Sequence, residues 1–170
     1  LEKLAKKYDL KLIEDAAQGF GGEINGKRAG SFGDIATTSF FPAKPLGCYG
    51  DGGAIFTNSD DHADLLRSLR VHGKGMDKYD NVCIGMNSRL DTIQAAILLD
   101  KLDEFSRELI NRNRLAEMYS KALEAEYDTP KIPAGYLSSW AQYTLRISNR
   151  DKLQGLLNSF GIPSVVYYPI

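Results

Sequence analysis

Apolar and polar positions follow two different periods along this chain, and the period changes where glycine and proline cluster. Residues 1–8 place leucines among lysines in the manner of the end of an amphipathic helix, and 10–15 form a short apolar run that ends on a carboxylate. Two further runs, 34–41 and 53–57, are rich in threonine, aromatic and apolar residues. The pattern predicts one helix end followed by three strands, as in an α/β chain.

Helical spacing dominates the middle of the chain. Ser59 can cap a helix over 60–71, because aspartates fill the first turns and leucines recur on one face. Apolar residues then recur every three or four positions over 95–123, behind capping-box spacing at 88–91. This predicts a long helix, kinked near Ser106, that connects two domains, although two ordinary core helices fit the same pattern.

The pattern of apolar and polar residues changes again after the turn-rich segment 127–133. Three further elements are predicted there: a strand over 142–147, a helix over 150–160 and a strand over 162–168. We expect 1–105 to form part of a large domain, and 106–170 to form the connector helix and an incomplete small domain. Because residue 1 is Leu within a helical stretch, we expect the chain to be an internal piece of a larger protein.

Composition narrows the classes of partner. The 170 residues are 43% hydrophobic and 25% charged, which is typical of a globular protein. The 21 Lys and Arg are scattered and balanced by 22 Asp and Glu, so neither nucleic acid nor a membrane is an expected partner. Cys48 and Cys83 lack C-x-x-C spacing, which favours unpaired thiols in the cytoplasm. His62 and His72 do not form a metal-ligand pattern, so we expect no metal.

Lys44 stands out as a candidate for covalent chemistry. It lies between Pro42 and Pro45, directly after an apolar strand, and these prolines restrict the backbone on both sides. Lysine forms Schiff bases with carbonyl compounds, but a lysine here can equally be a surface side chain with an apolar stem. The glycines of 47–53 lack the G-x-G-x-x-G spacing and precede a strand, which argues against a dinucleotide site.

Three more side chains suggest which carbonyl compound is bound. Asp15 ends a buried strand, where open α/β sheets place ligands, and a buried carboxylate is the usual partner of the pyridoxal phosphate ring nitrogen. Gln18 can turn its amide to the ring hydroxyl, and Ser39 can donate to a phosphate oxygen. Each residue alone has an ordinary structural explanation. The order Asp-x-x-Gln followed by Ser-x-x-x-x-Lys favours pyridoxal phosphate.

Four ordered motifs, at 13–18, 30–34, 39–54 and 85–96, carry a family resemblance. The chain resembles the DegT-type sugar aminotransferases, which are fold type I pyridoxal phosphate enzymes that act on nucleotide-linked keto sugars. The resemblance implies the second half of an aspartate aminotransferase-like large domain, followed by the start of a small α+β C-terminal domain. Members of this family are about twice as long as this chain.

The resemblance also implies roles for the cofactor-binding residues. Lys44 would bind pyridoxal phosphate covalently, Asp15 would pair with the ring nitrogen, Gln18 would contact the ring hydroxyl, and Ser39 would bind the phosphate. Asn87, in the G-x-N-x-R motif, would reach the phosphate of the neighbouring subunit's cofactor, which implies a homodimer with shared active sites.

Substrate residues follow from the same resemblance. Arg89 would bind a substrate carboxylate through its forked guanidinium, and tyrosines would contact sugar or base, with Tyr168 foremost among Tyr49, Tyr79, Tyr167 and Tyr168. The amino donor implied is L-glutamate. The sequence of 40–54 most resembles that of the branch that aminates UDP-2-acetamido-2-deoxy-3-oxo-glucuronate. That branch acts in the synthesis of lipopolysaccharide O-antigen, a bacterial surface polysaccharide. That branch often has His-Tyr-Pro where this chain has Tyr-Tyr-Pro at 167–169.

Other functions fit parts of the pattern. A sugar 4-aminotransferase of the same family, and a dTDP-linked sugar in place of a UDP-linked one, are both compatible with the motifs. A sugar dehydratase of this fold carries His in place of the lysine, so Lys44 argues against it. A non-catalytic or truncated ligand-binding chain, or a nucleotide-binding module without covalent chemistry, remains a further alternative.

Overall fold

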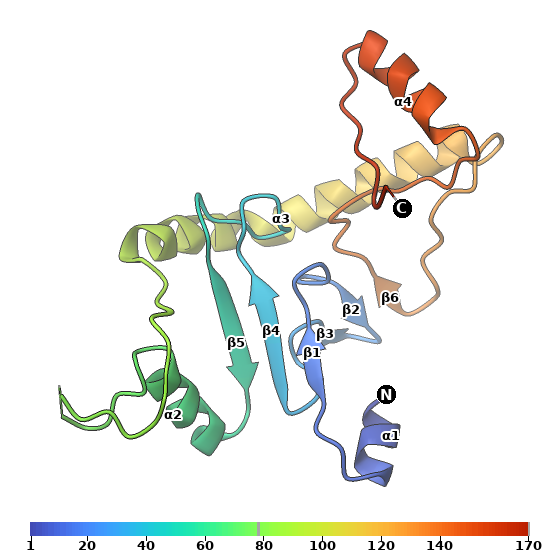
Figure 1. The fold of residues 1–170 in the computed structure, drawn as a ribbon. Coiled ribbons are helices and arrows are strands. Elements are labelled where there is room, and N and C mark those ends of the chain that lie inside the picture. Colours follow the sequence, from blue (N-terminus) through green and yellow to red (C-terminus); the bar gives the residue numbers. More distant parts are fainter. Residues whose placement is uncertain (78, 170) are drawn as a thin grey trace.

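A three-stranded sheet positions the candidate site (Figure 1). The computed structural model describes residues 1–77 and 79–169. The strands are β1 (Ile13–Asp15), β4 (Ile35–Ser39) and β5 (Gly53–Thr57), in the order β1-β4-β5. β1 and β4 are parallel, whereas β5 is antiparallel to β4. The three predicted strands are therefore confirmed, with β1 and β4 shorter than predicted.

Two short helices flank this sheet in sequence. α1 (Glu2–Lys7) precedes β1, and α2 (Asp60–Leu69) follows β5. Ser59 caps α2 as predicted, because its hydroxyl accepts a hydrogen bond from His62 N at 3.2 Å.

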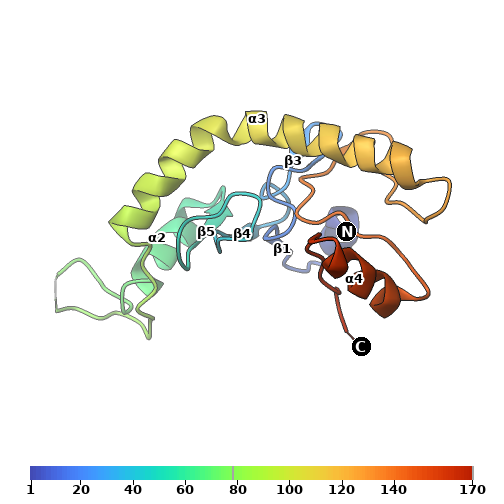
Figure 2. The ribbon, with the colours of Figure 1, turned by 90° about the horizontal axis from the view of Figure 1, so that it is seen from above.

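The middle of the chain forms one long helix, α3 (Thr92–Leu123), which is about 48 Å long. This outcome confirms the single helix over the alternative of two. The helix begins after Asp91, without a side-chain cap, so the capping box expected at Ser88 is not formed. Figure 2 shows that α3 bends in its first half. The helix runs through the expected boundary between 105 and 106 without interruption, and the division into two domains remains a prediction.

The core lies between α3 and one face of the sheet. Its buried members are Phe40, Leu46, Cys48, Leu98, Phe105 and Leu109. The ring of Phe20 stacks between Phe56 and Phe105, at centroid distances of 6.0 Å and 5.7 Å. Side chains alternate between the two faces of a strand, so the opposite face presents Ile13 and Ile55, which are 66% and 50% exposed.

A smaller antiparallel sheet joins two distant segments. Its strands are β2 (Glu23–Ile24), β3 (Lys27–Arg28) and β6 (Tyr136–Leu137), in the order β3-β2-β6. Asn25 and Gly26 make the turn between β2 and β3 with positive φ angles. Strands of two residues carry too few positions to show a period, which explains why the sequence pattern did not reveal them.

Two of the predicted strands near the end of the chain are wrong. Residues 142–147 and 162–168 are not strands, whereas the helix between them is confirmed as α4 (Arg150–Ser159). Burial does alternate along 142–147, as in a half-buried strand. A strand also needs a hydrogen-bonded neighbour, and among the described residues this segment has only an isolated bridge between Arg146 and Asp128.

Among the described residues, three further features concern cysteine pairing, metal binding and membrane spans. Both cysteines are free. Within 1–77 and 79–169, no three His, Cys, Asp or Glu side chains gather as a metal site would require. None of the helices in these ranges combines the length and the apolar character needed to cross a bilayer.

Candidate active site

The parallel pairing of β1 and β4 brings Asp15 and Ser39 to the same edge of the sheet. Asp15 is in register with Thr37, and Ala16 N continues the pairing by donating to Thr37 O at 2.8 Å. Ser39 lies two residues beyond Thr37, so the side chains of Asp15 and Ser39 occupy the same face. This is the carboxyl-terminal edge of the parallel strands, where open α/β sheets bind ligands.

One local and one long-range hydrogen bond hold Asp15 and Gln18 at the end of β1. Asp15 Oδ1 accepts from Ala17 N at 3.0 Å, which closes a turn directly after the strand. Gln18 O accepts from the hydroxyl of Ser139 at 3.0 Å, and Ser139 is itself buried. Asp15, Gln18 and Ser139 line a cavity of about 800 Å³ between β1 and the β6 region.

Lys44 belongs to the loop over 42–52, which we call the lysine loop. Lys44 N donates to Phe41 O at 2.8 Å, and Phe41 N donates to the hydroxyl of Ser39 at 3.2 Å. These bonds form a tight turn immediately after β4. The chain is then buried from Pro45 to Cys48, whereas Lys44 itself is partly exposed. Lys44 therefore lies where a strand end meets a buried segment.

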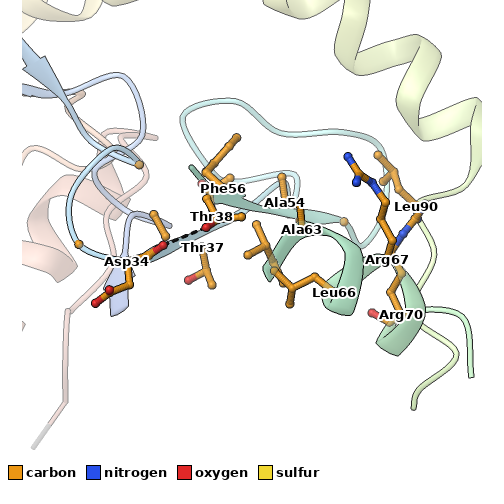
Figure 3. A pocket seen from close by; sticks show the side chains of 18 of the residues that line it. Asp34, Thr37, Thr38, Ala54, Phe56, Ala63, Leu66, Arg67, Arg70 and Leu90 are labelled. Carbon is orange, nitrogen blue, oxygen red and sulfur yellow. Dashed lines mark hydrogen bonds between the residues drawn. The ribbon is translucent and has the colours of Figure 1, made fainter. Parts of the chain in front are cut away.

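A second cavity of about 1090 Å³ is lined by residues of β4, β5 and α2, of which Thr37, Phe56 and Leu66 are labelled in Figure 3. Asn87 and Arg89 also line this cavity. Arg89 Nε donates to Asn87 Oδ1 at 3.1 Å, so the two predicted residues contact each other. Arg67 of α2 and Arg70, the C-cap residue of that helix, line the same cavity, together with Asp34 and Asp51. Of the described residues that line it, none belongs to the group of Asp15, Gln18, Ser39 and Lys44.

The predicted tyrosines do not gather around Asp15 and Gln18, nor around Asn87 and Arg89. Tyr168 is 68% exposed, its carbonyl accepts from Arg150 Nη1 at 3.4 Å, and its ring packs edge-on against Tyr167. Tyr49 lies in the lysine loop, and Tyr79 is exposed in the segment before Asn87. The single chain thus brings Asp15 together with Gln18 in one cavity and with Ser39 on one sheet face, and it leaves the predicted substrate residues apart from them.

Three residues that the sequence pattern did not single out touch the site segments. Gln94 and Lys101 of α3 bond to the lysine loop, and Ser139 bonds to Gln18. Gln94 falls within the motif over 85–96, so its motif position was a usable signal. Lys101 and Ser139 carry no local signal, because their partners lie 54 and 121 residues away in sequence.

The site offers the functional groups that a carbonyl cofactor requires. Lys44 supplies a primary amine that has no hydrogen bond or ion pair among the described residues, and Asp15 leaves one carboxylate oxygen outside its turn. The hydroxyl of Ser39 at the end of β4 and the side-chain amide of Gln18 after β1 add neutral polar groups. An amine, a carboxylate and a hydroxyl at one sheet edge fit an aldehyde cofactor with a basic ring nitrogen and a phosphate.

Comparison with known proteins places this arrangement in a family. The family model described as the DegT/DnrJ/EryC1/StrS aminotransferase family matches residues 1–170, and the chain belongs to that family. A UDP-2-acetamido-2-deoxy-3-oxo-D-glucuronate aminotransferase from Pseudomonas aeruginosa is 47% identical over all of this chain and 47% of its own length. A dTDP-3-amino-3,6-dideoxy-alpha-D-galactopyranose transaminase from Aneurinibacillus thermoaerophilus is 41% identical over 98% of this chain and 46% of its own length.

Solved structures agree with the family assignment. A DegT DnrJ EryC1 StrS aminotransferase from Brucella abortus has a TM-score of 0.95 at 54% identity, covering 98% of this chain and 44% of that one. NtdA from Bacillus subtilis, with bound cofactor PMP, has a TM-score of 0.84 at 32% identity, covering 99% of this chain and 40% of that one. The predicted fold class is confirmed. The chain spans about half the length of the relatives it matches.

Proposed function

We propose that the protein containing this chain is a pyridoxal phosphate-dependent aminotransferase that transfers an amino group to a nucleotide-linked keto sugar. The observation that carries the proposal is the position of Lys44, an amine without a described partner, beside the sheet edge that bears Asp15 and Ser39. Membership of the aminotransferase family and the PMP bound to NtdA support the cofactor.

Each cofactor residue has a separate task in this proposal. Bound pyridoxal phosphate supplies an aldehyde that reacts with amines and a ring that accepts electrons. Lys44 would hold the cofactor covalently, and its free amine would move the proton at the amino donor's α carbon. Asp15 would keep the ring nitrogen protonated, Gln18 would orient the ring through its hydroxyl, and Ser39 would donate to the phosphate.

The separation of Asn87 from Lys44 supports a homodimer with shared active sites. Asn87 and Arg89 line a different cavity from Asp15 and Gln18 within one chain, so they serve a site of this kind most directly across a subunit boundary. The segment before them carries exposed apolar side chains, with Met76 and Ile84 at 99% and 97% exposure. Such side chains are typical of protein interfaces.

A UDP-linked 3-oxo-glucuronate is the substrate that we favour, with L-glutamate as the amino donor. The 47% identity with the Pseudomonas aeruginosa enzyme supports this sugar, and the guanidinium of Arg89 can bind a uronate carboxylate. A dTDP-linked sugar is the alternative, supported by the 41% identity with the Aneurinibacillus enzyme. Turnover of the UDP uronate against a dTDP-linked 3-keto sugar decides between them, and a clear preference for the dTDP sugar would remove the UDP assignment.

The decisive test of the proposed function is covalent capture of the cofactor. The full-length protein is mixed with pyridoxal phosphate, reduced with borohydride and digested, and the Lys44 peptide is weighed by mass spectrometry. We expect the mass of a reduced adduct on Lys44, and loss of that adduct and of transamination in Lys44→Ala.

Lys121→Ala is the matched control, because Lys121 pairs with Glu117 on the exposed surface of α3. It should retain both the adduct and turnover. Transamination by Lys44→Ala at the wild-type rate would overturn the mechanism.

A further inference from the structure

α3 presents three consecutive contacts to the lysine loop on one face. Gln94, Leu98 and Lys101 are spaced by four and three residues, which places them on the same side of a helix. Leu98 packs in the buried cluster that also contains Leu46 and Cys48 of the loop. Gln94 and Lys101 flank this apolar contact with polar ones.

The polar contacts reach the backbone of the lysine loop. Gln94 Oε1 accepts a hydrogen bond from Tyr49 N at 2.8 Å. Lys101 Nζ donates to Gly47 O at 2.5 Å and lies 5.6 Å from the centroid of the Tyr49 ring. A charge-assisted bond to a buried carbonyl is among the stronger hydrogen bonds in proteins. Gly47 is buried and lies three residues after Lys44.

Hydrogen bonds at the base of the lysine loop connect the segment held by α3 to the residue that follows β4. Phe40 N donates to Gly52 O at 2.8 Å, and Cys48 N donates to Phe40 O at 2.8 Å, so the loop is closed across its base. The thiol of Cys48 lies 3.1 Å from both Phe40 O and Gly50 O. The backbone that follows Lys44 is thus bound both to Phe40, the residue directly after β4, and to α3.

We propose that Gln94 and Lys101 are positioning residues that hold the lysine loop so that Lys44 stays at the sheet edge beside Asp15. The proposal rests on the proposed function, because it assigns these two residues to the placement of the cofactor-binding amine. Neither residue needs to touch cofactor or substrate. A displacement of about 1 Å is enough to slow a reaction between two held groups by roughly a hundredfold.

The test compares Lys101→Met with Lys101→Arg in the full-length protein. Methionine keeps the length and the apolar stem but removes the donor, whereas arginine keeps a charged donor. Capture of pyridoxal phosphate on Lys44 is timed by borohydride quenching and mass spectrometry. We expect Lys101→Met to slow capture by about tenfold, the loss expected for one charge-assisted hydrogen bond, and Lys101→Arg to restore most of the rate.

A second readout separates positioning from loss of folding. Reductive methylation of Lys44 is followed against pH in cofactor-free protein, and the unfolding midpoint is measured alongside. Lys101→Met should alter the methylation profile of Lys44, whereas Lys121→Met, on the same helix but paired with Glu117, should not. In steady state, kcat should fall in Lys101→Met while KM for the sugar nucleotide stays near the wild-type value.

Gln94 provides an independent pair of variants. Gln94→Glu keeps an oxygen to accept from Tyr49 N, and Gln94→Leu removes it. Slower capture in Gln94→Leu than in Gln94→Glu supports the proposal even where Lys101→Met does not fold. Equal capture rates and equal methylation profiles across folded variants at both positions would overturn it. Absence of any adduct on Lys44 in the wild-type protein would instead overturn the proposed function.

Discussion

Gly47 occupies a point in the lysine loop that has no room for a side chain. A Cβ atom there would lie 2.7 Å from Pro42 O and 2.8 Å from Phe41 O. Phe41 O is the carbonyl that accepts from Lys44 N, so the close approach of these backbone segments also fixes the turn that carries the amine. The glycine at this position is required by packing of backbone against backbone.

Replacing this glycine should therefore weaken the fold and the site together. Gly47→Ala is expected to lower the free energy of unfolding by about 2 kcal/mol, because backbone atoms must move to admit the methyl group. Capture of pyridoxal phosphate by Lys44 should slow in the same variant. Urea denaturation and borohydride trapping of the full-length protein measure the two effects.

Gly155 offers the opposite case. It lies within α4, and a Cβ there meets nothing within 4 Å. Gly155→Ala should raise the stability of the helix by about 0.5–1 kcal/mol, since alanine loses less backbone entropy than glycine on folding. Equal effects of the two alanine substitutions on the unfolding midpoint would contradict this account.

Asp15 gives a prediction that separates binding from chemistry. Asp15→Asn preserves the shape of the side chain and its turn with Ala17 N but removes the negative charge. Turnover should fall by at least tenfold because the ring nitrogen loses its charged partner, whereas borohydride should still fix the cofactor to Lys44. Steady-state kinetics and mass spectrometry on one preparation test both parts, and near wild-type turnover would remove the role assigned to Asp15.

The sequence alone identified Asp15, Ser39 and Lys44 as a group, and the structure brings their segments together. Their positions follow from strand ends, which a short local pattern marks well. Gln94 and Lys101 act across 45 and 54 residues, so only the packing of α3 on the loop reveals them. The roles of all these residues remain predictions.

At the scale of elements, the helix α3 contacts both an early and a late segment of the described chain. Its first half carries Gln94 and Lys101 against the lysine loop, and its second half bonds to the segment around Trp140. Trp140 Nε1 donates to Asn113 Oδ1 at 3.0 Å, and the hydroxyls of Ser120 and Tyr143 lie 2.9 Å apart. One helix therefore links the lysine loop to the segment around Trp140, in which Ser139 donates to Gln18 O.

An exposed ion pair near the end of α3 makes the stability of the helix depend on pH. Glu117 and Lys121 lie 2.9 Å apart, and the hydrogen bond from Lys121 lowers the pKa of Glu117 and raises the pKa of Lys121. The stabilisation is complete above the ordinary Glu value of 4.5 and is lost as pH falls through the lowered pKa of Glu117. It is also lost as pH rises through the raised pKa of Lys121, above the ordinary value of 10.5.

Glu117→Gln should thus reduce stability slightly at pH 7 and make no difference at pH 2. Thermal unfolding of the full-length protein at both pH values measures this, with wild type as the reference. Because the pair is exposed, added salt should reduce the difference at pH 7. An effect of equal size at pH 2 would show that the substitution acts through something other than the ion pair.

Most longer elements were predictable, as was the three-residue strand β1, whereas two-residue strands and unpaired segments were not. α2, α3 and β5 show their period over five or more positions, so the pattern located them within a few residues. The two-residue strands β2, β3 and β6 show none. For 142–147 the alternation was present, but the pairing that makes a strand depends on a neighbour that the sequence pattern does not specify.

At the scale of the whole molecule, apolar side chains are unevenly covered. α3 covers one face of the main sheet, while Ile13 and Ile55 on the other face are exposed, and β1 and β5 have open outer edges among the described strands. Figures 1 and 2 show α3 running from the β5 side of the sheet to the side that carries β6 and α4. Apolar faces and open strand edges of this kind favour association with further chain.

The apolar segment before Asn87 gives a prediction for assembly. Ile84→Lys should weaken the proposed homodimer, because burial of a lysine at an interface is unfavourable whereas burial of isoleucine is favourable. Sedimentation of the full-length protein over a range of concentrations measures the change in dissociation constant, which should rise at least tenfold. Lys152→Glu on exposed α4 is the control for altered surface charge.

The register between β1 and β4 has a consequence for how this chain tolerates insertions. Asp15 and Ser39 share a face only because Asp15 stands opposite Thr37, and side chains on a strand alternate from one residue to the next. One residue inserted within β1 or β4 would therefore turn the carboxylate and the hydroxyl to opposite faces. One residue inserted in the turn at Asn25 and Gly26 would leave both in place, so active variants from an insertion library should contain insertions at that turn and lack them in the two strands.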